Sequence, residues 1–191
     1  MAKARKEKVD TLADFNRILS VLKSKQYSPF YLLEGEEFYY IDQLIDFFDE
    51  QILDADQKDF NLMTLYGKDS EWSDVVNACS RFPMFADYTI VILREAVQMK
   101  NLDELIPYFK HPTSSTLLII DYRGKDTNSK DKWAKALADN NAIIFKSQKL
   151  SEAEVPTWIQ QYGGMQQLKI EREQAETLAA YLGNDLQKIT N

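Results

Sequence analysis

Apolar side chains recur along this chain in two patterns that alternate with each other. In residues 9–26 and 37–53 they fall every three or four positions, which is the spacing of one face of an amphipathic helix. Between such segments lie short, nearly continuous apolar runs, which are typical of strands buried on both faces. Five runs of this kind predict strands at residues 29–33, 60–66, 89–93, 116–120 and 142–145.

Shorter helical patterns separate the later strands. Apolar residues at helical spacing predict helices around residues 72–79, 102–109 and 130–140. Alternation of strands and helices favours a parallel sheet with helices on both faces, because parallel neighbours must be joined by crossover connections. The predicted fold class is therefore α/β, with a five-stranded parallel sheet flanked by helices.

Only helical patterns follow the last predicted strand. Ser151 and Glu154 have the spacing of a capping box, so a helix is expected to open there and to be broken by Gly163-Gly164. A second helix is predicted over residues 171–182, and the chain ends inside a third helical pattern, as a piece of a longer protein would. We therefore expect a charged tail at residues 1–8, an α/β domain at 9–149 and a small all-helical domain at 150–191.

The composition limits the classes of protein that fit. The chain has 191 residues, a formal net charge of -7 and a pI near 4.8. It is a poor stand-alone DNA binder, because phosphate affinity comes largely from clustered Lys and Arg, so any DNA role needs a local basic patch or a partner. One cysteine, Cys79, excludes an internal disulfide and a multi-cysteine zinc site. The basic start leads into no apolar segment and no run could span a bilayer, so a cytoplasmic protein is expected.

The ends of the predicted strands do not carry the residues that nucleotide chemistry requires. A phosphate-binding loop needs a Gly-rich backbone and a Lys directly after the first strand. Here that strand runs into EGEE at residues 34–37, which has one glycine, Gly35, and three carboxylates that would repel phosphate. The third strand ends in Arg94, where a magnesium site would need Asp. Gly124-Lys125, after the fourth strand, lacks the upstream glycine.

Two isolated residues are weaker candidates for chemistry. Asp121, at the end of the fourth strand, has the donor type of a metal ligand, but a lone strand-end Asp is more often a helix cap or a solvated loop residue. His111 is the sole histidine; it precedes Pro112 in a loop and has no cysteine near it in the sequence. We therefore predict no catalytic, cofactor-binding or metal-binding residue.

Large apolar side chains, Phe82, Met84 and Phe85, stand with Pro83 in the short link between a predicted helix and the third strand. Apolar residues in such a link usually pack under the loop into the core, and the residues alone favour that interpretation. Two details favour an exposed tip instead. The flanking elements already supply apolar faces, and Pro83 stiffens the turn so that Met84 and Phe85 could point outward. Met and Phe are also common anchors at interfaces.

Several stretches, in this order, resemble the N-terminal part of the delta subunit of the bacterial DNA polymerase III clamp loader. They are YLLEGEE (31–37), RFPMF (81–85), IVILREA (90–96), STLLII (115–120), LSE through WI (150–159) and LGNDL (182–186). Together they cover nearly all of the chain after the N-terminal tail. The resemblance implies an AAA+-like, P-loop NTPase-type domain without a working P-loop, a small helical lid domain, and a C-terminal collar domain that is missing here.

The resemblance also implies a function. Members of this family grip the ring-shaped DNA sliding clamp through a hydrophobic pair at the tip before the third strand, and Met84 and Phe85 occupy that place. The usual pair is Leu-Phe, so Met84 is a conservative departure, and Phe82 and Pro83 would support the pair. The expected protein is a non-catalytic subunit of the DNA polymerase holoenzyme that binds and opens the clamp during DNA replication. It would need no cofactor and would not hydrolyse ATP itself. Its implied partners are the clamp, the other loader subunits and, indirectly, DNA, but no membrane.

Two other interpretations stay open from the residues alone. One is an atypical nucleotide-dependent, P-loop-like enzyme, and the other is an α/β scaffold protein with no clamp contact. Nucleotide binding separates the first from the rest, and clamp binding separates the scaffold from the loader subunit.

Overall fold

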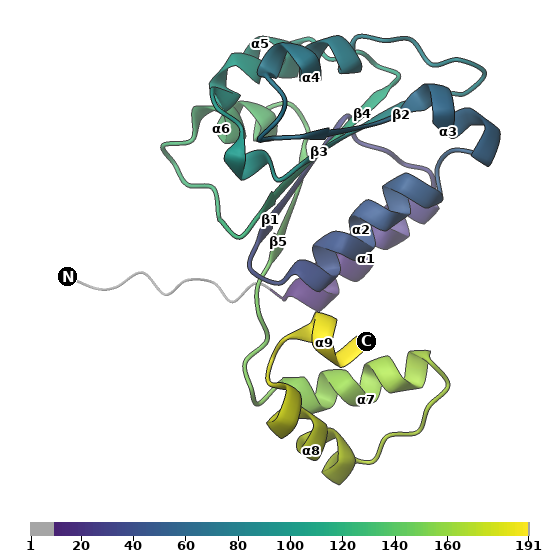
Figure 1. Cartoon of the computed structure of the whole chain (residues 1–191), viewed down its shortest axis with the longest axis vertical. Helices are drawn as coiled ribbons and strands as arrows, with labels where there is room; N and C mark the ends of the chain where they lie inside the picture. The colour runs from purple at the N-terminus through teal and green to yellow at the C-terminus, as the bar shows by residue number, and fades with distance from the viewer. Residues whose placement is uncertain (1–9, 191) are drawn as a thin grey trace.

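The computed structural model describes residues 10–190, so the predicted tail at residues 1–8 lies outside the described part of the chain. Among the described residues, five parallel strands form a sheet in the order β2-β3-β4-β1-β5 (Figure 1). The strands are β1 (Phe30–Gly35), β2 (Leu62–Tyr66), β3 (Thr89–Arg94), β4 (Thr116–Arg123) and β5 (Ile143–Ser147). The predicted fold class, a five-stranded parallel sheet flanked by helices, is confirmed.

Helices cover both faces of the sheet (Figure 1). On one face lie α1 (Thr11–Lys23) and α2 (Phe38–Glu50); on the other lie α4 (Trp72–Cys79), α5 (Ile106–Lys110) and α6 (Lys132–Ala138). Alternate strand residues point to opposite faces. Tyr31 and Leu33 therefore join the buried cluster under α1 and α2, whereas Phe30 and Leu32 join the cluster on the other face. Burial on both sides explains why the strands read as nearly continuous apolar runs.

The predicted strand at residues 60–66 begins too early, because Phe60 and Asn61 belong to a helix, α3 (Ala55–Asn61), that the apolar pattern does not reveal. Asn61 is the buried residue of α3, so this helix has no apolar stripe that periodicity could detect. A capping box between Asp54 and Gln57 starts the helix instead. β2 then runs from Leu62 to Tyr66.

The predicted helix at residues 102–109 is divided in the structure. A 3-10 helix, η2 (Leu102–Leu105), leads directly into α5, and a shorter one, η1 (Ala96–Gln98), follows β3. Pro107 lies in the first turn of α5, where the missing N–H of proline costs no helical hydrogen bond. None of the helices in the described part of the chain combines the length and the hydropathy needed to cross a bilayer.

Three helices follow the sheet: α7 (Val155–Met165), α8 (Arg172–Leu182) and α9 (Leu186–Thr190). The predicted start of the first helix is wrong, because α7 begins at Val155. The N–H and the hydroxyl of Ser151 both donate to the Glu154 carboxylate, so this local ring forms ahead of the helix. Pro156 then occupies the first turn of α7, which suits a residue without an N–H.

Gly163-Gly164 does not break α7, contrary to the expectation from the sequence, because the helix continues to Met165. A Cβ atom on Gly163 would lie 2.6 Å from Cδ1 of Ile170. The glycine therefore allows the segment that follows the helix to pack closely against it.

The helices after the sheet pack against α2. The indole N–H of Trp158 donates to the hydroxyl of Tyr40 at 2.6 Å, and the Trp158 ring stacks on Tyr162 with 5.1 Å between centroids. Trp158 and Leu186 belong to one buried apolar cluster with the strand residues that α1 and α2 cover. Figure 1 shows α9 beside the end of α2 that it contacts. The division into an α/β domain at residues 9–149 and a lid domain at 150–191 stays a prediction.

Candidate functional site

The link between α4 and β3, residues 80–88, presents its large apolar side chains to solvent. Phe82 is 82% exposed, Phe85 is 87% exposed and Met84 is 49% exposed, while Pro83 is half-buried. The expectation that apolar residues in such a link pack into the core is therefore wrong for these side chains. We call residues 82–85 the tip. An exposed apolar group of this size is typical of a binding surface.

Helix α3 holds the backbone of the tip. The side chain of Asn61 is fully buried; its Oδ1 accepts from the N–H of Met84 at 2.6 Å, and its Nδ2 donates to the carbonyl of Met84 at 2.8 Å. Nε2 of Gln57 donates to the carbonyl of Phe85 at 2.7 Å. Phe85 has a φ of +57°, in the left-handed region that few non-glycine residues adopt. The hydrogen bonds from α3 therefore hold the tip in a conformation that its own residues do not favour.

The two ends of the link are also fixed. Before the tip, Nη1 of Arg81 lies 3.3 Å from Sδ of Met63 in β2. After it, Ala86 and Tyr88 pack against the main core, and the Tyr88 ring meets Tyr27 edge-on with 5.3 Å between centroids. The tip is thus an ordered projection, in which the backbone is bonded to the protein and the side chains face outward. Sequence reasoning identified the apolar residues of the tip and missed Asn61 and Gln57, which belong to the helix that it did not detect.

The turn between β1 and α2 is the place where a P-loop would bind phosphate, and its backbone donors are already used. The N–H groups of Glu36 and Glu37 donate to the carbonyl of Ser147 in β5, at 2.9 and 3.2 Å, and the N–H of Gly35 donates to the carbonyl of Lys125 at 3.2 Å. A Cβ atom on Gly35 would lie 2.1 Å from the Ser147 oxygen. The turn is therefore pressed against the neighbouring strand and has no free row of amides for a phosphate.

Two of the carboxylates in this turn have structural partners. Glu34 is buried and its carboxylate lies 2.9 Å from Nζ of Lys146, its register partner on β5. Oε1 of Glu37 accepts from the N–H of Tyr39 at 3.0 Å, so this side chain caps the N-terminus of α2. Burial raises the pKa of Glu37 above its usual value, against the opposing effect of that hydrogen bond. A carboxyl group thus stands at the helix end where a phosphate would be bound in a nucleotide site.

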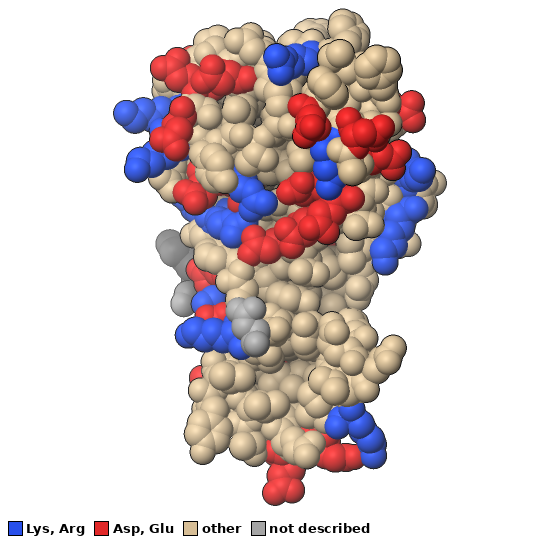
Figure 2. Space-filling model, turned by 45° about the vertical axis from the view of Figure 1, so that its right-hand side comes forward, with Lys and Arg blue, Asp and Glu red and all other residues tan. Residues whose placement is uncertain are grey.

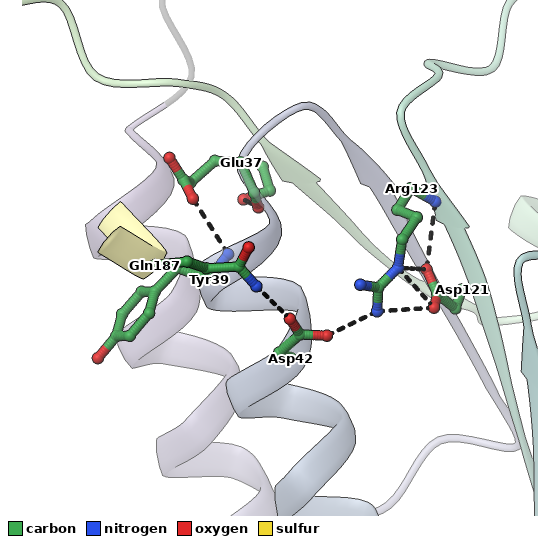
Figure 3. A network of polar contacts seen from close by, with 7 residues as sticks. Glu37, Tyr39, Asp42, Asp121, Arg123 and Gln187 are labelled. Carbon is green, nitrogen blue, oxygen red and sulfur yellow. Dashed lines mark hydrogen bonds and ion pairs between the residues drawn. The ribbon is translucent and has the colours of Figure 1, made fainter. Parts of the chain in front are cut away.

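Asp121 is neither a helix cap nor a solvated loop residue, contrary to the usual roles expected for it. It is fully buried, and both of its oxygens accept from Nε of Arg123, at 2.9 and 2.8 Å. Nη2 of Arg123 also bonds Asp42 of α2 at 2.7 Å, and Gln187 of α9 donates to the other oxygen of Asp42 at 2.6 Å (Figure 3). The ion pair of Asp121 and Arg123 could be predicted from the sequence, because residues two apart on a strand lie on the same face.

Arg123 is the cation that pairs with both carboxylates of this network, Asp121 and Asp42. Burial disfavours the guanidinium cation, but the hydrogen bonds and charges of Asp121 and Asp42 outweigh burial and raise the pKa of Arg123. The network links β4, α2 and α9, at the level where the helices after the sheet meet α2 (Figure 3). It holds Asp121 in an ion pair, so this residue is not a free metal ligand.

The remaining candidates for chemistry give no site. Arg94 ends β3, and its carbonyl accepts from the N–H of Gly67 at 2.9 Å. His111 is exposed at the end of α5. Burial raises the pKa of the Cys79 thiol to about 12, so it is protonated at neutral pH. Within residues 10–190 no group of three or more His, Cys, Asp or Glu side chains is placed to hold a metal ion.

The architecture is AAA+-like, and the family model for the DNA polymerase III delta subunit matches residues 31–148, which is more than half of the chain. This chain belongs to that family. A curated relative, DNA polymerase III subunit delta of Bacillus subtilis (strain 168), is 21% identical over 178 residues, which cover 88% of this chain and 51% of the relative.

Solved structures show the same fold. The Bacillus subtilis DNA clamp loader delta protein matches with a TM-score of 0.72 and 20% identity, over 92% of this chain and 56% of that one. A DNA polymerase III gamma subunit-related protein of Thermotoga maritima matches with a TM-score of 0.50 and 12% identity, over 95% and 56% of the two chains. A Thermotoga maritima RuvB variant also matches, with a TM-score of 0.50, 15% identity and coverages of 89% and 55%. The chain thus spans about half the length of the relatives that it matches.

Proposed function

We propose that this chain is the part of a clamp-loader subunit that binds and opens a ring-shaped DNA sliding clamp during DNA replication, without hydrolysing ATP itself. The family supports the general role. The observation that carries the specific role is the tip, where Met84 and Phe85 are exposed on a backbone that Asn61 and Gln57 hold in place. We further propose that residues 9–149 form the AAA+-like domain and residues 150–191 its lid, and that the protein acts in the cytoplasm.

Binding would use Met84 and Phe85 as anchors in an apolar pocket of the clamp. Phe82, also exposed, and the half-buried Pro83 would flank the anchors and exclude water around them. Because the backbone of the tip is already fixed by hydrogen bonds, binding would order few additional groups, which favours affinity. Other loader subunits and, through the assembled complex, DNA are the further partners that we propose.

Opening would follow from differential binding. A ligand shifts a two-state equilibrium only by the difference between its affinities for the two states. Moving a clamp from 1:99 to 99:1 in favour of the open form needs a difference of about 5.5 kcal/mol. Two well-buried anchors that each contribute about 2 kcal/mol supply most of this, provided that their pocket is complete only in the open clamp.

The β1–α2 turn supports the proposal that ATP is not used by this chain. Its amides are bonded to Ser147 and Lys125, and the buried side chain of Glu37 caps α2. Control by ATP would then come from other subunits of the loader. The bonded amides of this turn disfavour the atypical nucleotide-dependent enzyme. The scaffold without clamp contact is the alternative that the binding experiment tests.

The experiment measures the affinity of the purified chain for the cognate sliding clamp, together with the rate at which the clamp leaves circular DNA. We expect the wild type to bind and to accelerate release. The double variant Met84→Ala/Phe85→Ala should bind at least a hundredfold more weakly, as two anchors of about 2 kcal/mol each require. Tyr181→Ala, which removes an exposed aromatic side chain from α8, is the matched control and should bind normally. Equal binding by the wild type and the double variant would overturn the assignment of the tip.

A further inference from the structure

Phe60 is exposed immediately next to the residue that holds the tip. It is 55% exposed in α3 and directly precedes Asn61, whose side chain bonds both backbone groups of Met84. We propose that the clamp-binding surface extends from the tip onto α3, with Phe60 as a further contact and with an acidic border, so that it fits an apolar pocket bordered by Lys and Arg. This inference rests on the proposed function of the tip.

Phe60 has little part in the packing of the fold. Within the described part of the chain, Phe60 belongs to neither buried apolar cluster and has no aromatic ring contact. It is also the one large apolar side chain of α3, which is held in place by the Asp54–Gln57 capping box and by Asn61. The core does not use this phenylalanine, and it is one residue along the chain from the Asn61 hydrogen bonds that hold the tip. Exposed large apolar side chains on neighbouring segments are typical of a binding surface.

A groove lies between the tip and the segments that follow α1 and α2 in the chain. Its volume is about 610 Å³. Phe85 and Gln57 line the groove together with the carboxylates of Asp54 and Asp87, and among residues 10–190 Lys25 is the single basic residue of its lining. With two carboxylates against one ammonium, the groove suits a basic side chain of the partner placed beside the Phe85 anchor.

The segment that includes α3 has an excess of negative charge, as the groove does. Residues 49–61, from the end of α2 through α3, contain five carboxylates and one basic residue, Lys58. Figure 2, in which the right-hand side of Figure 1 comes forward, shows Asp and Glu across the α/β part of this face with Lys and Arg among them. An excess of one charge around an apolar contact directs association toward a surface of the opposite charge and sets the rate of binding more than its final strength.

The test uses the whole chain and the cognate sliding clamp, with association and dissociation rates measured at low and at physiological salt. Phe60→Ala should raise the Kd about tenfold, mainly through faster dissociation. Asp59→Lys combined with Asp87→Lys should slow association at low salt about tenfold and flatten its dependence on salt. Asp59 lies in the last turn of α3, where a Lys favours the helix dipole, so the change should not unfold α3.

Matched controls on α8 keep the result interpretable. Tyr181→Ala removes an exposed aromatic ring and Glu173→Lys reverses an exposed charge, both away from the tip, and neither should change the binding rates. Thermal unfolding of each variant confirms that it is folded. A Kd for Phe60→Ala within twofold of the wild type, or faster association after the charge reversal, would overturn this inference. If Met84→Ala/Phe85→Ala still abolishes binding in that case, the proposed function stands and only the extension onto α3 fails; if that double variant binds normally, the proposed function fails as well.

Discussion

Asn61 bonds both backbone groups of Met84, twenty-three residues further along the chain: its Oδ1 accepts from the N–H at 2.6 Å and its Nδ2 donates to the carbonyl at 2.8 Å. The same amide also donates to the carbonyl of Gln57 within α3 at 2.9 Å. One buried side chain thus joins the helix to the tip, and the position of the proposed anchors depends on it.

Replacing Asn61 by Ala should weaken both folding and clamp binding. The change leaves the N–H and carbonyl of Met84 without their partner, which costs about 1–3 kcal/mol of unfolding free energy. It also frees the tip, so clamp affinity should fall even where the variant is fully folded. Urea unfolding and clamp binding of the same sample measure the two effects.

The control for this variant is Asn140→Ala. Asn140 donates to the carbonyl of Ala136 at 2.7 Å, so its loss removes a side chain–backbone bond away from the tip. It should lower stability without changing clamp affinity. If folded Asn61→Ala protein binds the clamp as the wild type does, Asn61 has only a structural role.

The double variant Met84→Ala/Phe85→Ala should keep nearly the full stability of the chain. Phe85 is 87% exposed and Met84 is 49% exposed, and surface substitutions usually change the unfolding free energy by less than about 0.5 kcal/mol. Burial of the pair would instead make the change cost about 4–8 kcal/mol. Melting temperatures of the variant and the wild type decide between these values, and a large drop would contradict the exposure of the tip.

Mg-ATP should give no saturable heat in calorimetry at millimolar concentration. The N–H groups of Glu36 and Glu37 are bonded to Ser147, and Arg94 stands where a magnesium site would need Asp. An ATP-binding subunit of the loader, measured in the same buffer, is the positive control. A micromolar Kd for this chain would show that the nucleotide site works and would favour the enzyme alternative.

The contribution of Glu37 to the stability of the chain should decrease as the pH rises. Burial raises its pKa above the ordinary value of 4.5, so the folded chain binds this proton more tightly than the unfolded chain. The contribution is therefore fully present below about pH 4.5 and is lost as the pH rises through the folded pKa. Glu37→Gln keeps a neutral acceptor for the N–H of Tyr39 and removes the titration.

The measurement is the unfolding free energy of the wild type and of Glu37→Gln as a function of pH. The stability of the variant relative to the wild type should increase between about pH 4 and pH 7, because only the wild type acquires a buried charge. Glu36→Gln, at the exposed neighbouring position, is the control. A difference between Glu37→Gln and the wild type that does not change with pH would contradict the raised pKa.

The sheet could be predicted from the sequence because its strands are buried on both faces and leave an unbroken apolar signal. α3 could not, because its buried residue is the polar Asn61 and its large apolar residue, Phe60, faces solvent. The tip was found as a cluster of apolar residues, but its exposure depends on hydrogen bonds from α3. Contacts of this kind, between segments far apart in the chain, cannot be predicted from local sequence.

Asp121, unlike the tip, has a partner close to it in the sequence. Its partner, Arg123, lies two residues away on β4 and shares a face of the strand with it, so the ion pair was within reach of sequence reasoning. The other members of the network, Asp42 and Gln187, come from α2 and α9. Only the packing of these helices brings them to Arg123.

Removing Arg123 should destabilise the chain strongly. Arg123→Met leaves the buried carboxylate of Asp121 without its cation, and breaking a buried pair from one side costs about 3–5 kcal/mol. The combined variant Asp121→Asn/Arg123→Met removes both charges and should cost less than the sum of the single changes, with a coupling of about 1–3 kcal/mol. The matched control is Arg172→Met, which breaks an exposed pair with Glu176 at 2.8 Å and should leave the free energy of unfolding nearly unchanged, because solvent screens exposed ion pairs. Urea unfolding of these variants tests the prediction, and additive costs for Asp121 and Arg123 would show that the pair shown in Figure 3 does not stabilise the folded chain as a unit.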